Sequence, residues 1–119
     1  MLFRSGRPLF GLPGNPASSM VGFELFVRPA LRRLLGFAHA LRPRAIAVLD
    51  EPLRHEGGRR HFVRAAVRRD GAVLRARANA RQGSGMLRSM VGVNALLDVP
   101  PESQLAAGDE VTAILLEAV

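Results

Sequence analysis

Apolar residues follow a helical spacing in the first third of the chain. They recur at intervals of three and four residues, at Met20, Phe23, Val27, Leu31 and Leu34. This is the period of one face of an α-helix. Val21 and Leu25 form a second apolar row beside the first, so we expect the helix to be covered on more than one side.

Turn residues mark both ends of this helix. Residues 8–12 predict a short strand, and residues 13–16 combine Pro-Gly with Asn-Pro, which are strong turn signals. Asn15 is suited to cap the helix and Pro16 to occupy its first position. Pro29 should kink the helix or divide it in two, and Gly36 should end it. Residues 37–44 then form a linker.

Beyond the linker the apolar period changes from helix to strand. Residues 45–49 predict a short strand, and residues 61–69 alternate between two faces. Val63, Ala65 and Val67 share one face, and Phe62, Arg64 and Arg68 share the other. Asp70-Gly71 is a strong hairpin signal, so residues 72–77 should return as the partner strand.

The rest of the chain reads as turns and further strands. The expected turns or loops are at 56–59, 82–85, 100–101 and 108–109, with one helical turn at 86–91 and strands at 93–99 and 110–116. The predicted fold class is therefore α+β. Residues 1–40 form an incomplete strand–turn–helix piece of an α/β domain, and residues 41–119 form a small, irregular β-barrel.

The opening piece is unusual by itself, because one strand and one broadly apolar helix cannot bury each other. We therefore expect the sequence to begin inside a larger α/β domain, with Met1 an internal methionine of a longer gene. We also expect the helix to be unstable without further partners.

Composition narrows the chemistry. The chain of 119 residues has no cysteine, which excludes disulfides, thiolate metal sites and cysteine nucleophiles. No apolar run approaches the ~20 residues that span a bilayer, so the expected location is the cytoplasm with no membrane partner. The acidic residues form no obvious cluster and the 3 histidines lie far apart in sequence, so a metal site within this chain is not expected.

The formal net charge of +7 raises the alternative of a nucleic-acid binder. However, every basic side chain is an arginine, the arginines are scattered from Arg4 to Arg88, and there is no Tyr or Trp to stack on bases. This skew, together with abundant Ala, Gly and Pro, is more typical of codon composition than of a binding face. Nucleic-acid binding therefore ranks last among the alternatives.

Residues 11–16 carry the first candidate site. A strand that feeds a stiff turn and then a helix presents unpaired N–H groups and a partial positive charge to an anion. A rigid, capped turn with no ligand explains the same residues, because Pro, Gly and Asn are what turns require.

Two further candidates lie in the predicted β unit. The glycines of residues 82–87 would let backbone amides approach an anion, with the hydroxyl of Ser84 as a further donor. Arg64 is suited to grip a phosphate with two parallel hydrogen bonds. An ordinary loop and a solvated arginine are the plain alternatives for these two.

Together these segments resemble a known family. GLPGNPASSMVGFELFVRPALRRLLG at 11–36, GRRHFVR at 58–64, QGSGMLRSMVGVNALLDVP at 82–100 and LAAGDEV at 105–111 are similar to the C-terminal part of the molybdopterin molybdenumtransferases (the MoeA and gephyrin E-domain family). The blocks agree in order and spacing over essentially the whole chain. The departures are His61, where the family usually has an acidic residue, and Ala95, where a glycine usually follows Asn94.

The resemblance implies a role in molybdenum cofactor synthesis. The family inserts molybdate into adenylylated molybdopterin and releases AMP with the help of a divalent cation such as Mg²⁺. It implies that the turn and the β unit bind molybdopterin and its phosphate through Pro13, Gly14, Asn15, Pro16, Ser18, Arg59, Arg64 and Ser84, with no catalytic residue or metal ligand in this chain. It also implies that the missing N-terminal domains supply Mg²⁺, and that the full-length protein is a homodimer. A fragment of this length is expected to be inactive alone.

A second class of function stays open. In gephyrin-like relatives the corresponding region also docks a receptor peptide, so the β unit could serve as a non-catalytic binding or scaffold module. No residue in this sequence marks a peptide groove.

Overall fold

The computed structural model describes residues 2–4, 7–12, 16–79 and 92–119. The described residues divide into two compact units, one that runs to Leu41 and one that begins at Arg42. Three expected features lie outside the described residues: the Asn15 cap, the glycine loop at 82–85 and the helical turn at 86–91.

The first unit begins with a hairpin. Strand β1 (Leu2–Arg4) pairs antiparallel with β2 (Arg7–Leu9), with Leu2 opposite Leu9. The predicted strand at 8–12 was therefore placed too late. Leu9 is the last paired residue of β2, because it lies opposite Leu2, the first residue of β1. Residues 8–12 alone do not indicate where this pairing ends.

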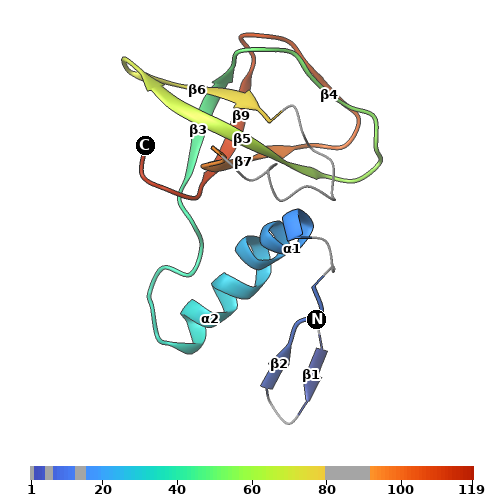
Figure 1. Cartoon of the computed structure of the whole chain (residues 1–119), viewed down its shortest axis with the longest axis vertical. Helices are drawn as coiled ribbons and strands as arrows, with labels where there is room; N and C mark the ends of the chain where they lie inside the picture. The colour runs from blue at the N-terminus through green and yellow to red at the C-terminus, as the bar shows by residue number, and fades with distance from the viewer. Residues whose placement is uncertain (1, 5–6, 13–15, 80–91) are drawn as a thin grey trace. The chain divides into compact units, whose positions relative to one another are not determined.

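The helix changes type ahead of its proline. It consists of α1 (Pro16–Gly22), a π-helical segment η1 (Phe23–Val27) and α2 (Arg28–Leu34), drawn from blue to cyan in Figure 1. The Arg28 N–H donates to the carbonyl of Phe23, five residues earlier. A proline ring clashes with the carbonyl four residues before it, and the wider π turn relieves that clash at Pro29. The prediction that Pro29 divides the helix is wrong, because the helix continues through Pro29 as α2 and its irregularity is the π-helical segment before the proline.

Gly36 ends the helix as predicted. Its φ of 84° lies in the left-handed region, which glycine adopts without a side-chain penalty. The Phe37 N–H donates to the Arg32 carbonyl (2.9 Å) and the Gly36 N–H to the Arg33 carbonyl (3.1 Å). This pair of bonds is the Schellman motif, which satisfies carbonyls that the helix leaves free.

The second unit is a closed barrel (Figure 1). Within the described residues its strands follow the order β3–β6–β5–β7–β9 and return to β3. Their bounds are β3 Arg44–Leu49, β5 His61–Asp70, β6 Val73–Ala78, β7 Ala95–Val99 and β9 Glu110–Leu115. All neighbours are antiparallel except β3 and β6, whose parallel pairing runs from Ala47 opposite Leu74 to Leu49 opposite Ala76. The prediction of a small β-barrel is confirmed.

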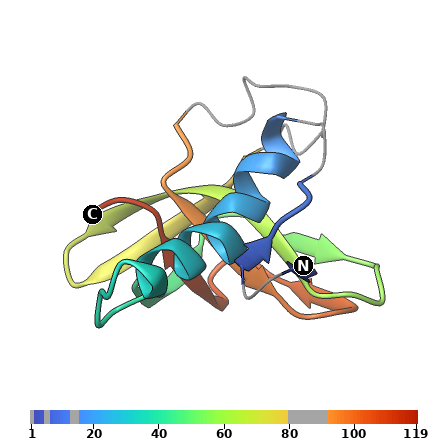
Figure 2. The ribbon, with the colours of Figure 1, turned by 90° about the horizontal axis from the view of Figure 1, so that it is seen from below.

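A tight hairpin joins β5 to β6. Asp70 pairs with Val73, so the two-residue turn consists of Gly71 and Ala72, one residue later than Asp70-Gly71 suggests. Gly71 has a φ of 61°, which favours glycine at this position. Figure 2 shows the two long strands running side by side to this turn, in green and yellow.

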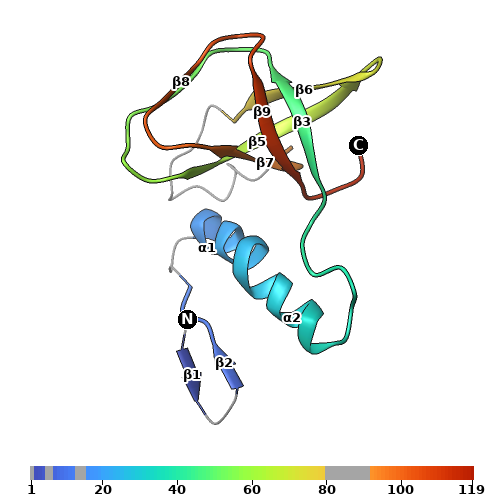
Figure 3. The ribbon, with the colours of Figure 1, turned by 180° about the vertical axis from the view of Figure 1, so that it is seen from behind.

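One pair of strands is absent from the sequence prediction. Strand β4 (Leu53–His55) pairs antiparallel with β8 (Ser103–Leu105). Figure 3 shows this pair from behind, with β8 in orange-red next to the green chain. Each strand has three residues and a single large apolar side chain, so neither shows a readable alternation.

Alanines fill the centre of the barrel. Each barrel strand contributes one alanine with 0% exposure, namely Ala47, Ala76, Ala65, Ala95 and Ala113. The interior of a barrel narrows as the number of strands falls, so small side chains are needed here. Larger residues, including Leu49, Leu97 and Val99, complete the core cluster.

Candidate substrate-binding site

Arg64 occupies the outward face of β5. The alternation of β5 turns Val63, Ala65 and Val67 into the core cluster, so Arg64 points away from it. Its side chain is nevertheless only 5% exposed. Burial lowers the pKa of the Arg64 guanidinium from its usual value, although an arginine remains charged at neutral pH. Arg64 is therefore a partly desolvated cation, which interacts more strongly with an anion than a solvated arginine does.

The chain that connects β6 to β7 leaves and returns beside Arg64. Ala65 pairs with Ala78 of β6 on one side and with Ala95 of β7 on the other, so the end of β6 and the start of β7 lie beside the same residue of β5. The N–H of Asn79, just after β6, donates to the Arg64 carbonyl (2.8 Å). The N–H of Asn94, just before β7, donates to the Ala65 carbonyl (3.1 Å). Both ends of the connection that contains Ser84 are thus fixed on the strand that carries Arg64, and Ser84 itself lies outside the described residues.

Arg59 is placed differently. It lies in the exposed turn before β5, where its carbonyl contacts Nε2 of His55 (2.5 Å). The three residue-to-residue steps along β5 from His61 to Arg64 span roughly 10 Å. Arg59 precedes this stretch of β5 in the chain, and its share in a site with Arg64 stays a prediction.

The residues of the first candidate turn belong to the other unit. Pro16 opens α1, and Ser18 lies in its first turn. Pro13, Gly14 and Asn15 lie outside the described residues. Their proposed partnership with Arg64 stays a prediction.

Acidic side chains neutralise several arginines of the barrel unit in local ion pairs. Asp50 accepts hydrogen bonds from Arg68 (2.5 Å) and Arg75 (2.8 Å), and these bonds lower the pKa of its carboxyl to about 2. Asp98 lies 3.2 Å from Arg44 and 3.3 Å from Arg60. Positive charge in this unit is therefore partly paired, which argues against one continuous nucleic-acid surface.

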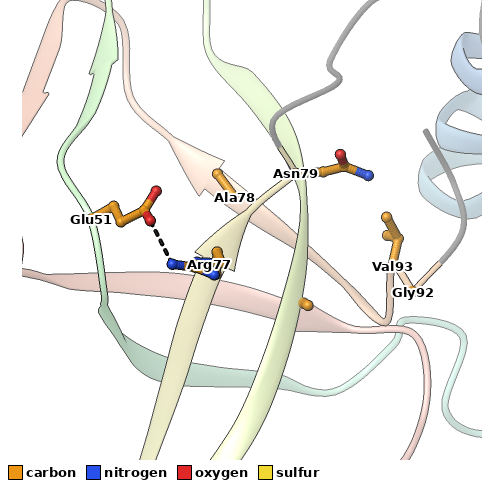
Figure 4. A pocket seen from close by; sticks show the side chains of 7 residues that line it. Glu51, Arg77, Ala78, Asn79, Gly92 and Val93 are labelled. Atoms are coloured by element: carbon orange, nitrogen blue, oxygen red, sulfur yellow. Dashed lines mark hydrogen bonds and ion pairs between the residues drawn. The ribbon is translucent and has the colours of Figure 1, made fainter.

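A pocket of about 450 Å³ opens beside the same connection, and sequence reasoning did not anticipate it. Its described lining consists of Glu51, Ala66, Arg77, Ala78, Asn79, Gly92 and Val93. Figure 4 shows the Glu51–Arg77 ion pair (2.7 Å) on one side and Asn79, Gly92 and Val93 on the other. The volume is typical of a small-molecule site. No spacing in the sequence indicates it, because its residues come from several strand ends.

The described residues contain neither a metal-binding cluster nor a membrane-spanning helix. In that part of the chain, no group of three or more His, Cys, Asp or Glu residues is arranged to hold a metal ion. Nor does any helix within the same residues have the length and apolar character to cross a membrane.

Comparison with known proteins gives the family. The model of the MoeA C-terminal region (domain IV) matches residues 46–116, which is more than half of the chain. The chain belongs to this family. The match begins within β3 and runs past the end of β9, and it includes Arg64 and both ends of the β6–β7 connection.

Individual relatives agree with this assignment. The chain is 38% identical over 108 residues to molybdopterin molybdenumtransferase 2 of Mycobacterium tuberculosis, and this covers 89% of the chain and 26% of the relative. It is 37% identical over 100 residues to the molybdenum cofactor synthesis protein cinnamon of Drosophila melanogaster, covering 82% of the chain and 16% of that protein. The chain thus spans about a quarter or less of the length of these relatives.

Solved structures share the fold. A molybdopterin biosynthesis MoeA protein from Pyrococcus horikoshii has a TM-score of 0.76 at 29% identity, over 97% of this chain and 28% of that chain. A molybdenum cofactor biosynthesis protein from Pyrococcus furiosus has a TM-score of 0.71 at 35% identity, over 86% of this chain and 36% of that chain. The MoeA-like character of the fold therefore rests on structure as well as on sequence.

Proposed function

We propose that this chain is the C-terminal portion of a molybdopterin molybdenumtransferase, and that its barrel binds the anionic part of adenylylated molybdopterin. The observation that carries the proposal is the arrangement around Arg64. A buried guanidinium and both ends of the Ser84-bearing connection lie on one short stretch of β5. Relatives named as molybdopterin molybdenumtransferases match this same part of the chain.

The proposed role of the barrel is electrostatic. Adenylylated molybdopterin carries a phosphate and a pyrophosphate link, and molybdate is an oxyanion. Such groups need donors that are already fixed in place, because fixed donors stabilise charge without reorganising during the reaction. Arg64 supplies a planar fork that can hold two oxygens of one phosphate, and Ser84 would add a hydroxyl donor. Residues Pro13, Gly14, Asn15, Pro16 and Ser18 complete the cleft in this proposal, with Arg59 as an outer contact.

In this proposal, the remaining steps of the reaction are carried out by the part of the relatives that this chain does not span. The described residues of this chain do not offer the clustered ligands that Mg²⁺ requires, so we assign Mg²⁺ to that other part. In the proposal the full-length protein works as a homodimer in the cytoplasm.

A chimera tests the proposal. The corresponding C-terminal quarter of the M. tuberculosis relative is replaced by this chain, and AMP release from adenylylated molybdopterin is followed after molybdate is added. We expect the chimera to be active and Arg64→Ala to reduce kcat/KM about 10- to 100-fold, as expected for loss of hydrogen bonds to a charged group. The matched control is Arg54→Ala, since Arg54 is an exposed arginine on β4.

Equal activity of the Arg64→Ala and Arg54→Ala chimeras would contradict the proposal. The nucleic-acid alternative predicts sequence-independent DNA binding by this chain that weakens steeply between 50 and 200 mM salt. The scaffold alternative predicts a folded chimera that releases no AMP.

A further inference from the structure

The side chain of Asn94 copies the hydrogen bonding of a peptide group. Its Oδ1 accepts from the Val67 N–H (2.7 Å), and its Nδ2 donates to the Val67 carbonyl (2.8 Å). Its own backbone N–H donates to the Ala65 carbonyl, and its carbonyl accepts from the Leu116 N–H (2.8 Å). Asn94 thereby links β5 to the segment that follows β9.

The Asn94 side chain supplies hydrogen bonds to β5 at a point where β7 does not pair with it. The β5–β7 ladder ends at the pair Ala65–Ala95. Ala65 and Val67 direct their backbone groups to the same side of β5, because hydrogen-bonding directions alternate along a strand. Val67 therefore faces the side on which β7 has not yet begun, and the amide of Asn94 takes the place of the missing strand. Without that amide, both backbone groups of Val67 would lose their partners on this side.

The position of this amide bears on Arg64. Asn79 is bonded to the Arg64 carbonyl on one side of β5, and Asn94 is bonded to Ala65 and Val67 on the other. The stretch of β5 that carries the buried guanidinium is thus held by the two ends of one connection. Asn94 adds two side-chain bonds to Val67 to its backbone bond to Ala65, so its hold on β5 depends on the chemistry of its side chain.

We propose that Asn94 is a positioning residue for the anion site, and that its side-chain amide fixes the returning end of the β6–β7 connection beside Arg64. This inference rests on the proposed function, because it assumes that Arg64 binds substrate. Asn94 itself touches no substrate in this proposal. It acts by holding the backbone of β5 and the start of β7 in one geometry.

The first arm of the test needs no ligand. Amide hydrogen exchange is measured on this chain and on Asn94→Ala, Asn94→Asp and the control Gln104→Ala, which removes an exposed amide on β8. We expect the protection factor of Val67 to fall at least about 10-fold in Asn94→Ala, and by less in Asn94→Asp, whose carboxylate still accepts from the Val67 N–H, while Val63 and Leu97 keep their protection. Asn94→Asp keeps the shape of the side chain but turns a second oxygen toward the Val67 carbonyl. Protonation of that carboxyl at low pH restores an O–H donor, so Val67 protection should recover there.

The second arm uses the active chimera. We expect Asn94→Ala and Asn94→Asp to raise KM for adenylylated molybdopterin about 10-fold with kcat within about threefold, and Gln104→Ala to change neither. Unchanged Val67 protection in Asn94→Ala would overturn the geometric step. Lost protection with an unchanged KM would overturn the positioning role, provided that Arg64→Ala still raises KM. If Arg64→Ala also leaves KM unchanged, the proposed function itself has failed, and the exchange result stands separately.

Discussion

Replacement of Leu97 by alanine tests whether the barrel is held together by its narrow core. Leu97 is fully buried, and on the neighbouring strands it pairs with Val63 of β5 and with Ala113 of β9. Val63 is 3% exposed and Ala113 is 0% exposed. The neighbouring alanines have no rotatable side chain that could move into the space, so little of the cavity can close.

The expected loss is large. Truncation of a buried leucine costs about 2–5 kcal/mol, and the cost is higher where the surroundings cannot collapse. We expect about 3 kcal/mol for Leu97→Ala, against a total stability of roughly 5–15 kcal/mol for a small domain. At about 4–8 °C per kcal/mol, Tm should fall by about 12–24 °C.

The matched control is Ile46→Ala on β3. Ile46 is also aliphatic and lies in the same barrel, but it is 57% exposed, so its truncation should change stability by less than about 0.5 kcal/mol. Both variants are compared by urea unfolding, and the slope m should be unchanged. A Leu97→Ala variant within about 1 kcal/mol of the wild type, or an equal effect of Ile46→Ala, would refute this account of the core.

Three further predictions concern charge and backbone. Arg68 and Arg75 lower the pKa of Asp50 to about 2 from the ordinary 3.8. The stability that this pairing contributes is therefore present above pH 3.8 and is lost as the pH falls through about 2. In an acid titration, the Asp50→Asn variant should lack this part of the unfolding transition. Burial, and then the charges of His55 and Arg64, lower the pKa of His61, so its ring should titrate below 6.5 by NMR, and His55→Ala should move the midpoint up. Because the pKa of His61 is lower in the folded protein, the stability linked to its neutral ring is complete above pH 6.5 and declines as the pH falls toward the folded pKa. Gly71→Ala should cost about 1–2 kcal/mol, because its φ of 61° strains any side chain although the space is open, whereas Gly58→Ala, with open space and no such φ, should be close to neutral in the same thermal melt.

The parts of the fold that the sequence predicted are those with a local cause. The alternation from His61 to Arg69 gave β5 and its two faces, the Asp70-Gly71 signal gave the hairpin to within one residue, and Gly36 gave the helix end. Each depends on a period or on a backbone preference that a few adjacent residues express.

The parts that the sequence did not predict depend on distant partners. The parallel pairing of β3 with β6 and the pairing of β4 with β8 join segments far apart in the chain, and three-residue strands show no period. The start of β7 was placed two residues too early, because apolar Val93 lies close before the apolar run that starts at Ala95, whereas in the structure the Asn94 side chain replaces the ladder at this point. The sequence did not indicate that alanines would line the narrow centre of the barrel.

Some features of the candidate site were also predicted from the sequence, and others were not. Arg64 was identified from the alternation of β5 and its place in the family motif, but its burial was not predicted, because the plain interpretation was a solvated arginine. The convergence of both ends of the 79–94 connection on β5 could not be predicted, since it follows from the order of strands around the barrel.

The most direct test of the account is a double-mutant cycle on Arg64 and Ser84 in the active chimera. The variants are Arg64→Ala, Ser84→Ala and their combination, and kcat/KM for adenylylated molybdopterin is measured for each. If both side chains hold one anion, the account predicts a coupling free energy of about 0.5–3 kcal/mol, so the double variant loses less than the product of the single losses. Losses that multiply to within about 0.3 kcal/mol would contradict the claim that Arg64 and Ser84 meet at one site.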